Sequence, residues 1–120
     1  MSVGFLTDVT DESGTVQPSL MVSILRLTKA ELARAAGLPP ESVSKRSRVS
    51  GRATQKRLRE VVEIITRVLP WAGSLPTAFA WYRSQPLPSF GDLTAEDLVK
   101  AGRAEAVRRH LSRLAEGGYA

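Results

Sequence analysis

Residues 86–102 read Pro-Leu-Pro-Ser-Phe-Gly-Asp-Leu-Thr-Ala-Glu-Asp-Leu-Val-Lys-Ala-Gly, and the rest of the chain is interpreted outward from this segment. Pro86 and Pro88 keep the backbone extended and prevent a helix there. Thr94 is a good N-cap, and Asp97 three residues later completes a near-capping box. Four apolar side chains are expected to reach a core: Phe90, Leu93, Leu98 and Val99. The sequence therefore predicts a stiff loop followed by a short capped helix, with Gly102 as its stop.

The chain after this segment is predicted to form one more helix, over Arg103 to Glu116. Its inner stripe consists of four residues at helical spacing: Ala104, Val107, Leu111 and Leu114. Four basic or titratable side chains lie largely outside that stripe: Arg108, Arg109, His110 and Arg113. The pair Gly117 and Gly118 is expected to stop the helix and to leave Tyr119 and Ala120 on a flexible tether.

Upstream of the segment, the longest helix is predicted from about Gln55 to Leu69. Thr54 is a suitable N-cap for it, and Pro70 is expected to end it. One face carries apolar residues at helical spacing: Leu58, Val61, Val62, Ile64, Ile65, Val68 and Leu69. We expect this stripe to form the centre of the core, and its width leaves open that part of it closes a homodimer.

A shorter helix is predicted over Leu75 to Ser84, and it carries three aromatic residues. Phe79 is assigned to the core. Two interpretations stay open for Trp81 and Tyr82, because these side chains suit either the core or an interface with a partner.

Two short helices joined by a glycine turn are predicted further upstream, which is the arrangement of a helix-turn-helix. Thr28 and Glu31 form a capping box for a helix from Lys29 to Ala36. Gly37 ends that helix, and a Pro-Pro pair starts the next one. The string resembles the Xre-type DNA-binding module of phage repressors.

The second helix of this motif is the expected DNA reader. Residues 28–60 hold nine Lys or Arg against three acids, a net charge of +6 that suits a phosphate backbone. The outward side chains expected to read bases are Glu41, Ser42, Ser44, Lys45 and Arg48. The expected backbone clamps are Arg48, which is thus assigned to both sets, and Arg52, Lys56, Arg57 and Arg59. The pattern departs from the Xre type at Arg46, where a third apolar anchor is usual. A solvated surface, or a helix-turn-helix kept only as a dimer scaffold, is the alternative.

The first residues lack any sustained period, so residues 1–18 are predicted to form a flexible N-terminal arm. Helical character begins at Ser19. The predicted organisation is all-α: the arm, a helix-turn-helix with its bridging helix over 19–69, and a small helical unit with the C-terminal tail over 70–120.

The composition and the motifs that are missing from the sequence exclude several kinds of site. There is no Cys, which excludes disulfides and thiolate metal sites. No apolar run is long enough for a membrane span and the start lacks signal-peptide features, so a cytoplasmic protein is expected. His110 is the only histidine, and no metal-ligand spacing, phosphate loop or Ser/His/Asp set accompanies it. The sequence predicts a non-enzyme without cofactor or metal.

Several strings of the last forty residues together resemble the toxin-binding half of the Xre/MbcA/ParS antitoxins. These strings are Trp81, the run Pro-Leu-Pro-Ser-Phe-Gly, the run Asp-Leu-Val-Lys-Ala-Gly-Arg, and the ending Glu-Gly-Gly-Tyr-Ala. The resemblance implies a homodimeric antitoxin that covers the active site of an NAD-consuming RES-domain toxin and represses its own operon through operator DNA. The residues expected to bind the toxin are Trp81, Tyr82, Arg108, Arg109, Arg113, Gly117, Gly118, Tyr119 and Ala120.

Two other functions remain open on the sequence. One is a helix-turn-helix transcriptional repressor whose C-terminal half only dimerises, although such a half has no need of the segment 86–102. The other is a scaffold that does not bind DNA, which salt-dependent binding to duplex DNA would exclude.

Overall fold

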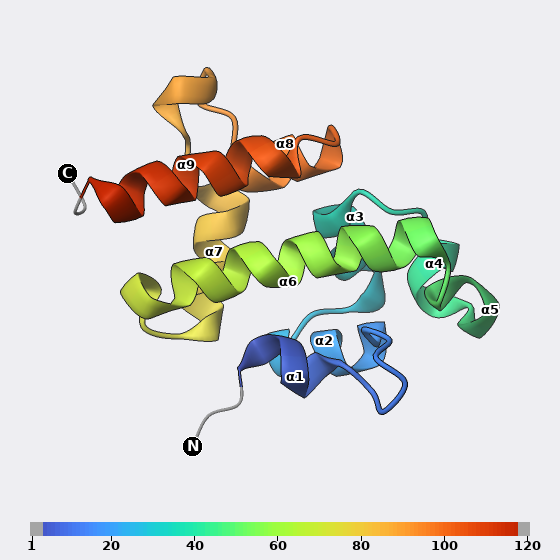
Figure 1. Ribbon diagram of the computed structural model, residues 1–120. Helices are drawn as coiled ribbons and strands as arrows, with labels where there is room; N and C mark the ends of the chain where they lie inside the picture. The colour runs from blue at the N-terminus through green and yellow to red at the C-terminus, as the bar shows by residue number, and fades with distance from the viewer. Residues whose placement is uncertain (1–3, 118–120) are drawn as a thin grey trace.

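The computed structural model describes residues 4–117, and within that range the fold is all-α, as predicted. The helices are α1 (Phe5–Val9), α2 (Pro18–Leu25), α3 (Lys29–Ala36), α4 (Pro40–Ser44), α5 (Arg46–Val49), α6 (Arg52–Ala72), α7 (Leu75–Ser84), the 3₁₀ turn η1 (Pro88–Phe90), α8 (Ala95–Lys100) and α9 (Ala104–Glu116). In Figure 1, α6 runs through the middle of the molecule, with α1 and α2 on one side and α8 and α9 on the other.

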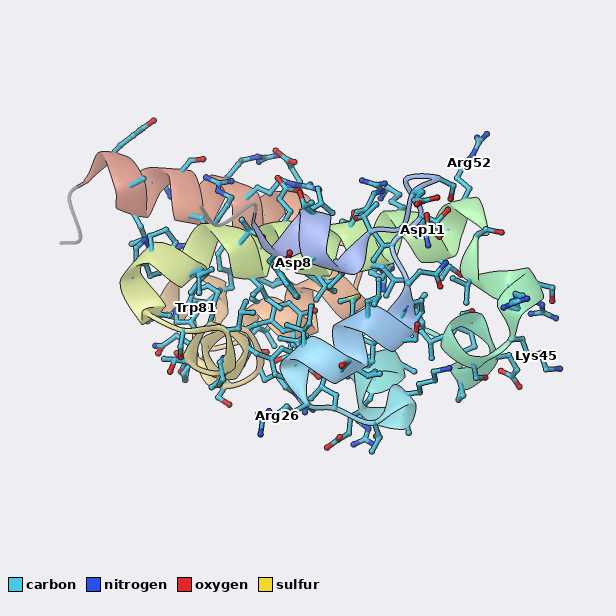
Figure 2. All side chains as sticks on the ribbon, turned by 90° about the horizontal axis from the view of Figure 1, so that it is seen from below. Asp8, Asp11, Arg26, Lys45, Arg52 and Trp81 are labelled. Carbon is cyan, nitrogen blue, oxygen red and sulfur yellow. The ribbon has the colours of Figure 1, made fainter. Side chains whose placement is uncertain are left out.

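The N-terminal residues 4–18 are folded, so the prediction of a flexible arm is wrong for them. Helix α1 packs on α6 (Figure 2), and it buries Phe5 and Val9. A β-bridge between Thr10 and Val16 then closes a loop, with Val16 fully buried. A five-residue helix is too short for its period to show in a sequence, and its stability comes from this tertiary burial. Residues 1–3 of the predicted arm lie outside the described residues.

Helix α6 is the centre of the core, as its apolar stripe predicts. Six residues of the stripe are at most 1% exposed: Leu58, Val61, Val62, Ile64, Ile65 and Val68. Because neighbouring helices of the same chain cover the stripe, a homodimer cannot close over it without unpacking the core.

The ends of α6 differ from the prediction. The helix begins at Arg52, so Thr54 is a buried residue of its first turn and not the N-cap. Pro70 does not end the helix but lies in its last turn, where the missing N–H removes only one intrahelical bond. Gly73, at a φ of 88°, ends the helix instead, and its N–H donates to the carbonyl of Leu69 at 2.9 Å.

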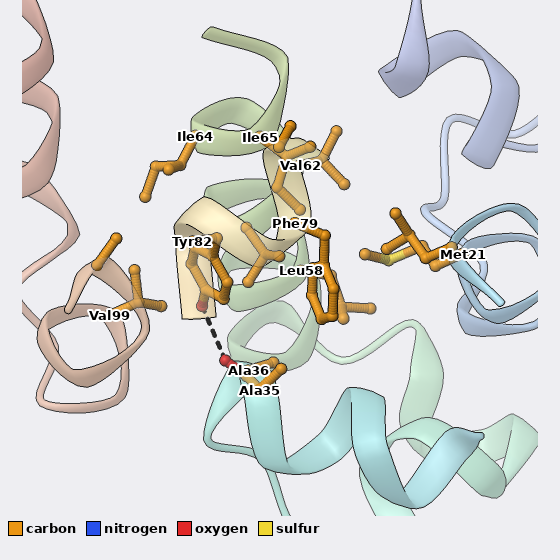
Figure 3. Packing of buried hydrophobic residues seen from close by; sticks show 14 of the residues in the cluster. Met21, Ala35, Ala36, Leu58, Val62, Ile64, Ile65, Phe79, Tyr82 and Val99 are labelled. Carbon is orange, nitrogen blue, oxygen red and sulfur yellow. Dashed lines mark hydrogen bonds between the residues drawn. The ribbon is translucent and has the colours of Figure 1, made fainter. Parts of the chain in front are cut away.

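The core continues across the predicted boundary between residues 69 and 70. Figure 3 shows Phe79 and Tyr82 of α7 packed between α6 and the end of α3. The Tyr82 hydroxyl donates to the carbonyl of Ala35 at 2.8 Å, and burial raises the pKa of this phenol far above its usual range. One buried cluster therefore includes residues from both predicted units, the one over 19–69 and the one that begins at residue 70.

The capped helix of the segment 86–102 is confirmed. Thr94 Oγ1 accepts a hydrogen bond from the N–H of Asp97 at 3.1 Å, and the Asp97 carboxylate accepts one from the N–H of Thr94 at 3.0 Å. Leu98 and Val99 are fully buried. The segment thus contributes two core residues from α8, a helix that contacts both α6 and α9.

The loop of the same segment packs differently from the prediction. Leu93 is 42% exposed and not part of the core, whereas Leu87 is buried. Gly91 and Asp92 both have positive φ, and this tight turn pairs Leu87 with Leu93 across a β-bridge. Phe90 lies half-buried against the core.

Candidate functional site

The candidate nucleic-acid surface begins at the turn between α3 and α4. The predicted capping box of α3 is present, with the Thr28 N–H donating to Glu31 at 2.8 Å and the Glu31 N–H donating to Thr28 at 3.0 Å. Gly37 ends α3 at a φ of 66°, and α4 begins at Pro40. A Cβ on Gly37 would lie 2.9 Å from Cγ and 3.1 Å from Cα of Lys100. Only glycine fits here without movement of α8.

The expected reading helix is divided into two pieces. The backbone leaves helical geometry at Lys45, with φ at −94° and ψ at 121°, between the five-residue α4 and the four-residue α5. This break leaves the Arg46 side chain exposed, at the position where the Xre pattern has an apolar anchor. Val43 and Val49 are the buried anchors of the two pieces.

Four of the five predicted base-reading residues are exposed: Glu41, Ser44, Lys45 and Arg48. Ser42 is only 8% exposed, because it lies on the inner face of α4, so the prediction that it points outward is wrong. The Ser44 hydroxyl donates to the carbonyl of Pro40 at 2.9 Å, so its proton is already engaged within α4.

Arg57, one of the predicted backbone clamps, has an internal role instead. Its guanidinium donates to the carbonyl of Ala36 at 2.8 Å and lies 3.4 Å from Glu60. It therefore satisfies a carbonyl at the end of α3 and is not free for a phosphate. Lys56 projects outward, although its ammonium pairs with Glu60 at 2.9 Å.

A group of unpaired cations remains at this end of the molecule, where Figure 2 labels Lys45 and Arg52. Its members are exposed and have no carboxylate oxygen within 4.0 Å among residues 4–117: Lys45, Arg46, Arg48 and Arg52. We call these four the α4–α6 cations. Arg46 was not among the predicted DNA contacts, because only the break at Lys45 turns its side chain outward. Arg59 is exposed as well and donates to the carbonyl of Gly14.

A second cationic surface lines a hollow of about 430 Å³ between α6 and α9. It brings together the three predicted toxin contacts Arg108, Arg109 and Arg113. Arg67 of α6 lines the same hollow, and its guanidinium donates to the Ser112 hydroxyl at 2.9 Å. Arg67 was not among the predicted toxin contacts, since its position beside α9 depends on the packing of α6 on α9 and not on spacing along one helix.

These arginines differ in how closely they pair with carboxylates of the same chain. Arg108 lies 2.9 Å from Glu63 and 3.0 Å from Glu105, and the hydrogen bond to Glu63 is the main reason that its pKa is raised. Arg109 is loosely paired with Glu105 at 3.8 Å. Arg113 is exposed and has no carboxylate within 4.0 Å in the described part of the chain. Arg109 and Arg113 are therefore the guanidinium groups most accessible to an acidic partner.

The two aromatic candidates separate into different environments. Tyr82 is 0% exposed, so the prediction that it contacts a partner directly is wrong. Trp81 is half-buried and packs edge-on against Trp71, with ring centroids 6.0 Å apart. Trp71 is 37% exposed, so the pair presents aromatic surface near the C-terminal end of α6.

The predicted C-terminal tail is described only in part. Gly117 ends α9, and its N–H donates to the carbonyl of Arg113 at 2.8 Å. Gly118, Tyr119 and Ala120 lie outside the described residues. The tail thus begins beside the hollow, whose lining includes Glu116.

His110, the histidine considered for catalysis, lies beside an aromatic ring. His110 is half-buried against the ring of Phe90, and its pKa is lowered by this burial and by nearby Arg113. In the described part of the chain, no three His, Asp or Glu side chains form a group suited to a metal ion. Within residues 4–117, no helix has the combined length and apolarity of a membrane span.

No family model, curated protein or solved structure matches this chain.

Proposed function

We propose that this chain is an antitoxin that binds and neutralises a RES-domain toxin and that also binds operator DNA to regulate its own operon. The observation that carries the proposal is the presence of two separate cationic surfaces at different ends of α6. One is formed by the α4–α6 cations and the other by the arginines of the α6–α9 hollow.

The α4–α6 cations support the DNA-binding half of the proposal. They follow a glycine turn between α3 and α4, and this pair of helices has the connectivity of the DNA-binding motif that the sequence resembles. Their charges lack internal partners within residues 4–117, so binding a phosphate breaks no existing ion pair. Because α4 is short, we expect these residues to contribute more to backbone affinity than to base discrimination.

The α6–α9 hollow supports the toxin-binding half. Arg109 and Arg113 line the same hollow as Glu116, the last residue of α9 before the tail. We propose that they pair with acidic residues at the rim of the toxin cleft while the tail enters the cleft. Guanidinium–carboxylate pairs of this kind add geometric specificity as well as affinity.

The first test is bacterial growth during induction of the adjacent reading frame, with and without this chain expressed from a separate promoter. We expect growth arrest from the neighbour alone and recovery with this chain. A harmless neighbour, or one that this chain does not rescue, would exclude the antitoxin function.

Two double variants separate toxin binding from DNA binding, and each is the control for the other. Arg109→Ala/Arg113→Ala should weaken rescue and leave duplex binding unchanged, whereas Lys45→Ala/Arg52→Ala should weaken duplex binding and leave rescue unchanged. A chain ending at Glu116 should lose rescue if the tail enters the toxin. Duplex binding without any rescue would instead favour a repressor whose C-terminal half only dimerises.

A further inference from the structure

A groove of about 640 Å³ lies between the N-terminal loop and the α4–α5 segment, and Arg46 of the α4–α6 cations lines it. Its walls come from four parts of the chain: the loop of residues 11–17, the first turn of α2, the start of α3, and α4–α5. None of the base-reading candidates except Ser44 lines it. The groove therefore shares Ser44 with α4, but most of its lining lies outside the predicted base-reading residues.

The charges that line the groove suit one singly charged anion. Lys29 and Arg46 are the lining cations, and neither has a carboxylate within 4.0 Å among the described residues. Asp11 is the lining acid, so the formal charge of the groove is +1. A phosphodiester carries one negative charge, whereas a nucleoside triphosphate carries several and would meet the Asp11 carboxylate.

The Asp11 carboxylate is already engaged by its own loop. One oxygen accepts hydrogen bonds from the N–H of Ser13 at 2.9 Å, the Ser13 hydroxyl at 2.7 Å and the N–H of Thr15 at 3.0 Å. The other oxygen accepts one from the Gln17 amide at 2.8 Å. These bonds lower the pKa of Asp11 to about 2, so the carboxylate is ionised and shapes the loop at neutral pH. Four hydrogen bonds to one carboxylate thus hold the loop wall together without a ligand.

Gln55 fixes the distance between the two walls. Its amide oxygen accepts from the N–H of Val16 at 2.8 Å, and its amide nitrogen donates to the carbonyls of Val16 and Val49 at 2.9 Å each. One side chain of α6 thus joins the loop to the end of α5. A preorganised groove of this kind loses little conformational entropy on binding.

We propose that this groove holds one phosphate of the DNA backbone, with Lys29 and Arg46 as its cationic contacts. Ser19 and Ser50 line the groove with exposed hydroxyls that have no hydrogen-bond partner within residues 4–117, so both can donate to the phosphate. This inference rests on the proposed DNA binding and extends it. It makes the N-terminal loop part of the nucleic-acid interface and gives Gln55 a positioning role.

The test is ethylation interference on the duplex upstream of this reading frame, with the full chain. Ethylation of one phosphate that blocks binding of the natural protein should cease to matter for both Lys29→Ala and Arg46→Ala. Each variant should also reduce the slope of log affinity against log salt by about 0.9, the loss for one phosphate contact. Arg103→Ala, which removes an equal charge from an exposed position between α8 and α9, outside the groove lining, should change neither readout.

The possible results distinguish a wrong groove assignment from a failure of the proposed DNA binding. If the natural protein binds the duplex but the interference pattern is the same in both variants, the groove assignment is wrong while the proposed DNA binding stands. If no duplex is bound at any salt concentration, both proposals are wrong. Saturable binding of inorganic phosphate that Lys29→Ala abolishes, without any change in duplex binding, would make the groove a site for free anions and would also overturn the assignment.

Discussion

At the scale of single residues, Tyr82 joins α7 to the end of α3 through one buried hydrogen bond. Tyr82→Phe keeps the ring but leaves the carbonyl of Ala35 without its donor. We expect the free energy of unfolding to fall by about 1–2 kcal/mol, measured by urea denaturation, because a buried acceptor loses its partner. Toxin rescue should be unchanged for this variant. Unchanged stability, or a loss of rescue in a variant that stays folded, would contradict the buried role of Tyr82.

The ionisation of Asp11 gives a prediction about how the stability of the protein depends on pH. Its pKa is about 2 in the folded protein against an ordinary value of 3.8, so the folded state binds its proton less readily than the unfolded state does. The resulting stability is present above about pH 4 and is lost as the pH falls toward 2. Urea denaturation between pH 6 and 2 should show a shallower acid dependence for Asp11→Asn. Identical slopes would mean that the loop does not retain its hydrogen bonds in solution.

At the scale of elements, two glycines at helix ends provide a matched comparison. Gly37 and Gly73 both end helices at positive φ, but a Cβ on Gly37 meets Lys100, whereas one on Gly73 meets nothing within 4 Å. Gly73→Ala should cost about 1–2 kcal/mol for the left-handed conformation alone. Gly37→Ala should cost about 1–3 kcal/mol more because α8 must move. Equal losses would show that the turn is not packed against α8.

Element bounds were predictable where the chain carries local signals. The helices 29–36 and 75–84 have the predicted bounds, because a capping residue and a stop residue are adjacent to them in sequence. Pro70 misled the prediction, since a proline in a last helical turn is tolerated when a later residue can take the terminal geometry. Helix α1 was missed because its support comes from α6.

The residues of the candidate sites were likewise predictable only where they lie close together in the sequence. The spacing on one helix predicted that Arg108, Arg109 and Arg113 lie largely outside the apolar stripe, and the three line one hollow. Arg67 and Arg46 joined the cationic surfaces only through packing and through a backbone break. Neither event leaves a signal in a single sequence.

At the scale of the whole molecule, the shared core determines how the two proposed functions can influence each other. Carbonyls at the end of α3 are satisfied by Tyr82 of α7 and by Arg57 of α6. Glu96 of α8, only 6% exposed, accepts a hydrogen bond from Arg83 of α7 at 2.7 Å. These contacts tie the start of the DNA-binding candidate to the helices beside the toxin-binding candidate, so the two parts are expected to unfold together.

Leu32→Ala tests this coupling, because Leu32 is a fully buried residue of α3 and the fluorescent residues lie in other helices. Trp71 lies at the C-terminal end of α6, and Trp81 lies in α7. A cavity in the core should cost about 2–5 kcal/mol. In one cooperative unit, tryptophan fluorescence and far-ultraviolet circular dichroism should shift to the same lower urea midpoint. A fluorescence midpoint that stays at its original value while the dichroism midpoint falls would show two independent units. The toxin-binding candidate would then fold without α3, and binding at one end of α6 would have no route through the core to the other.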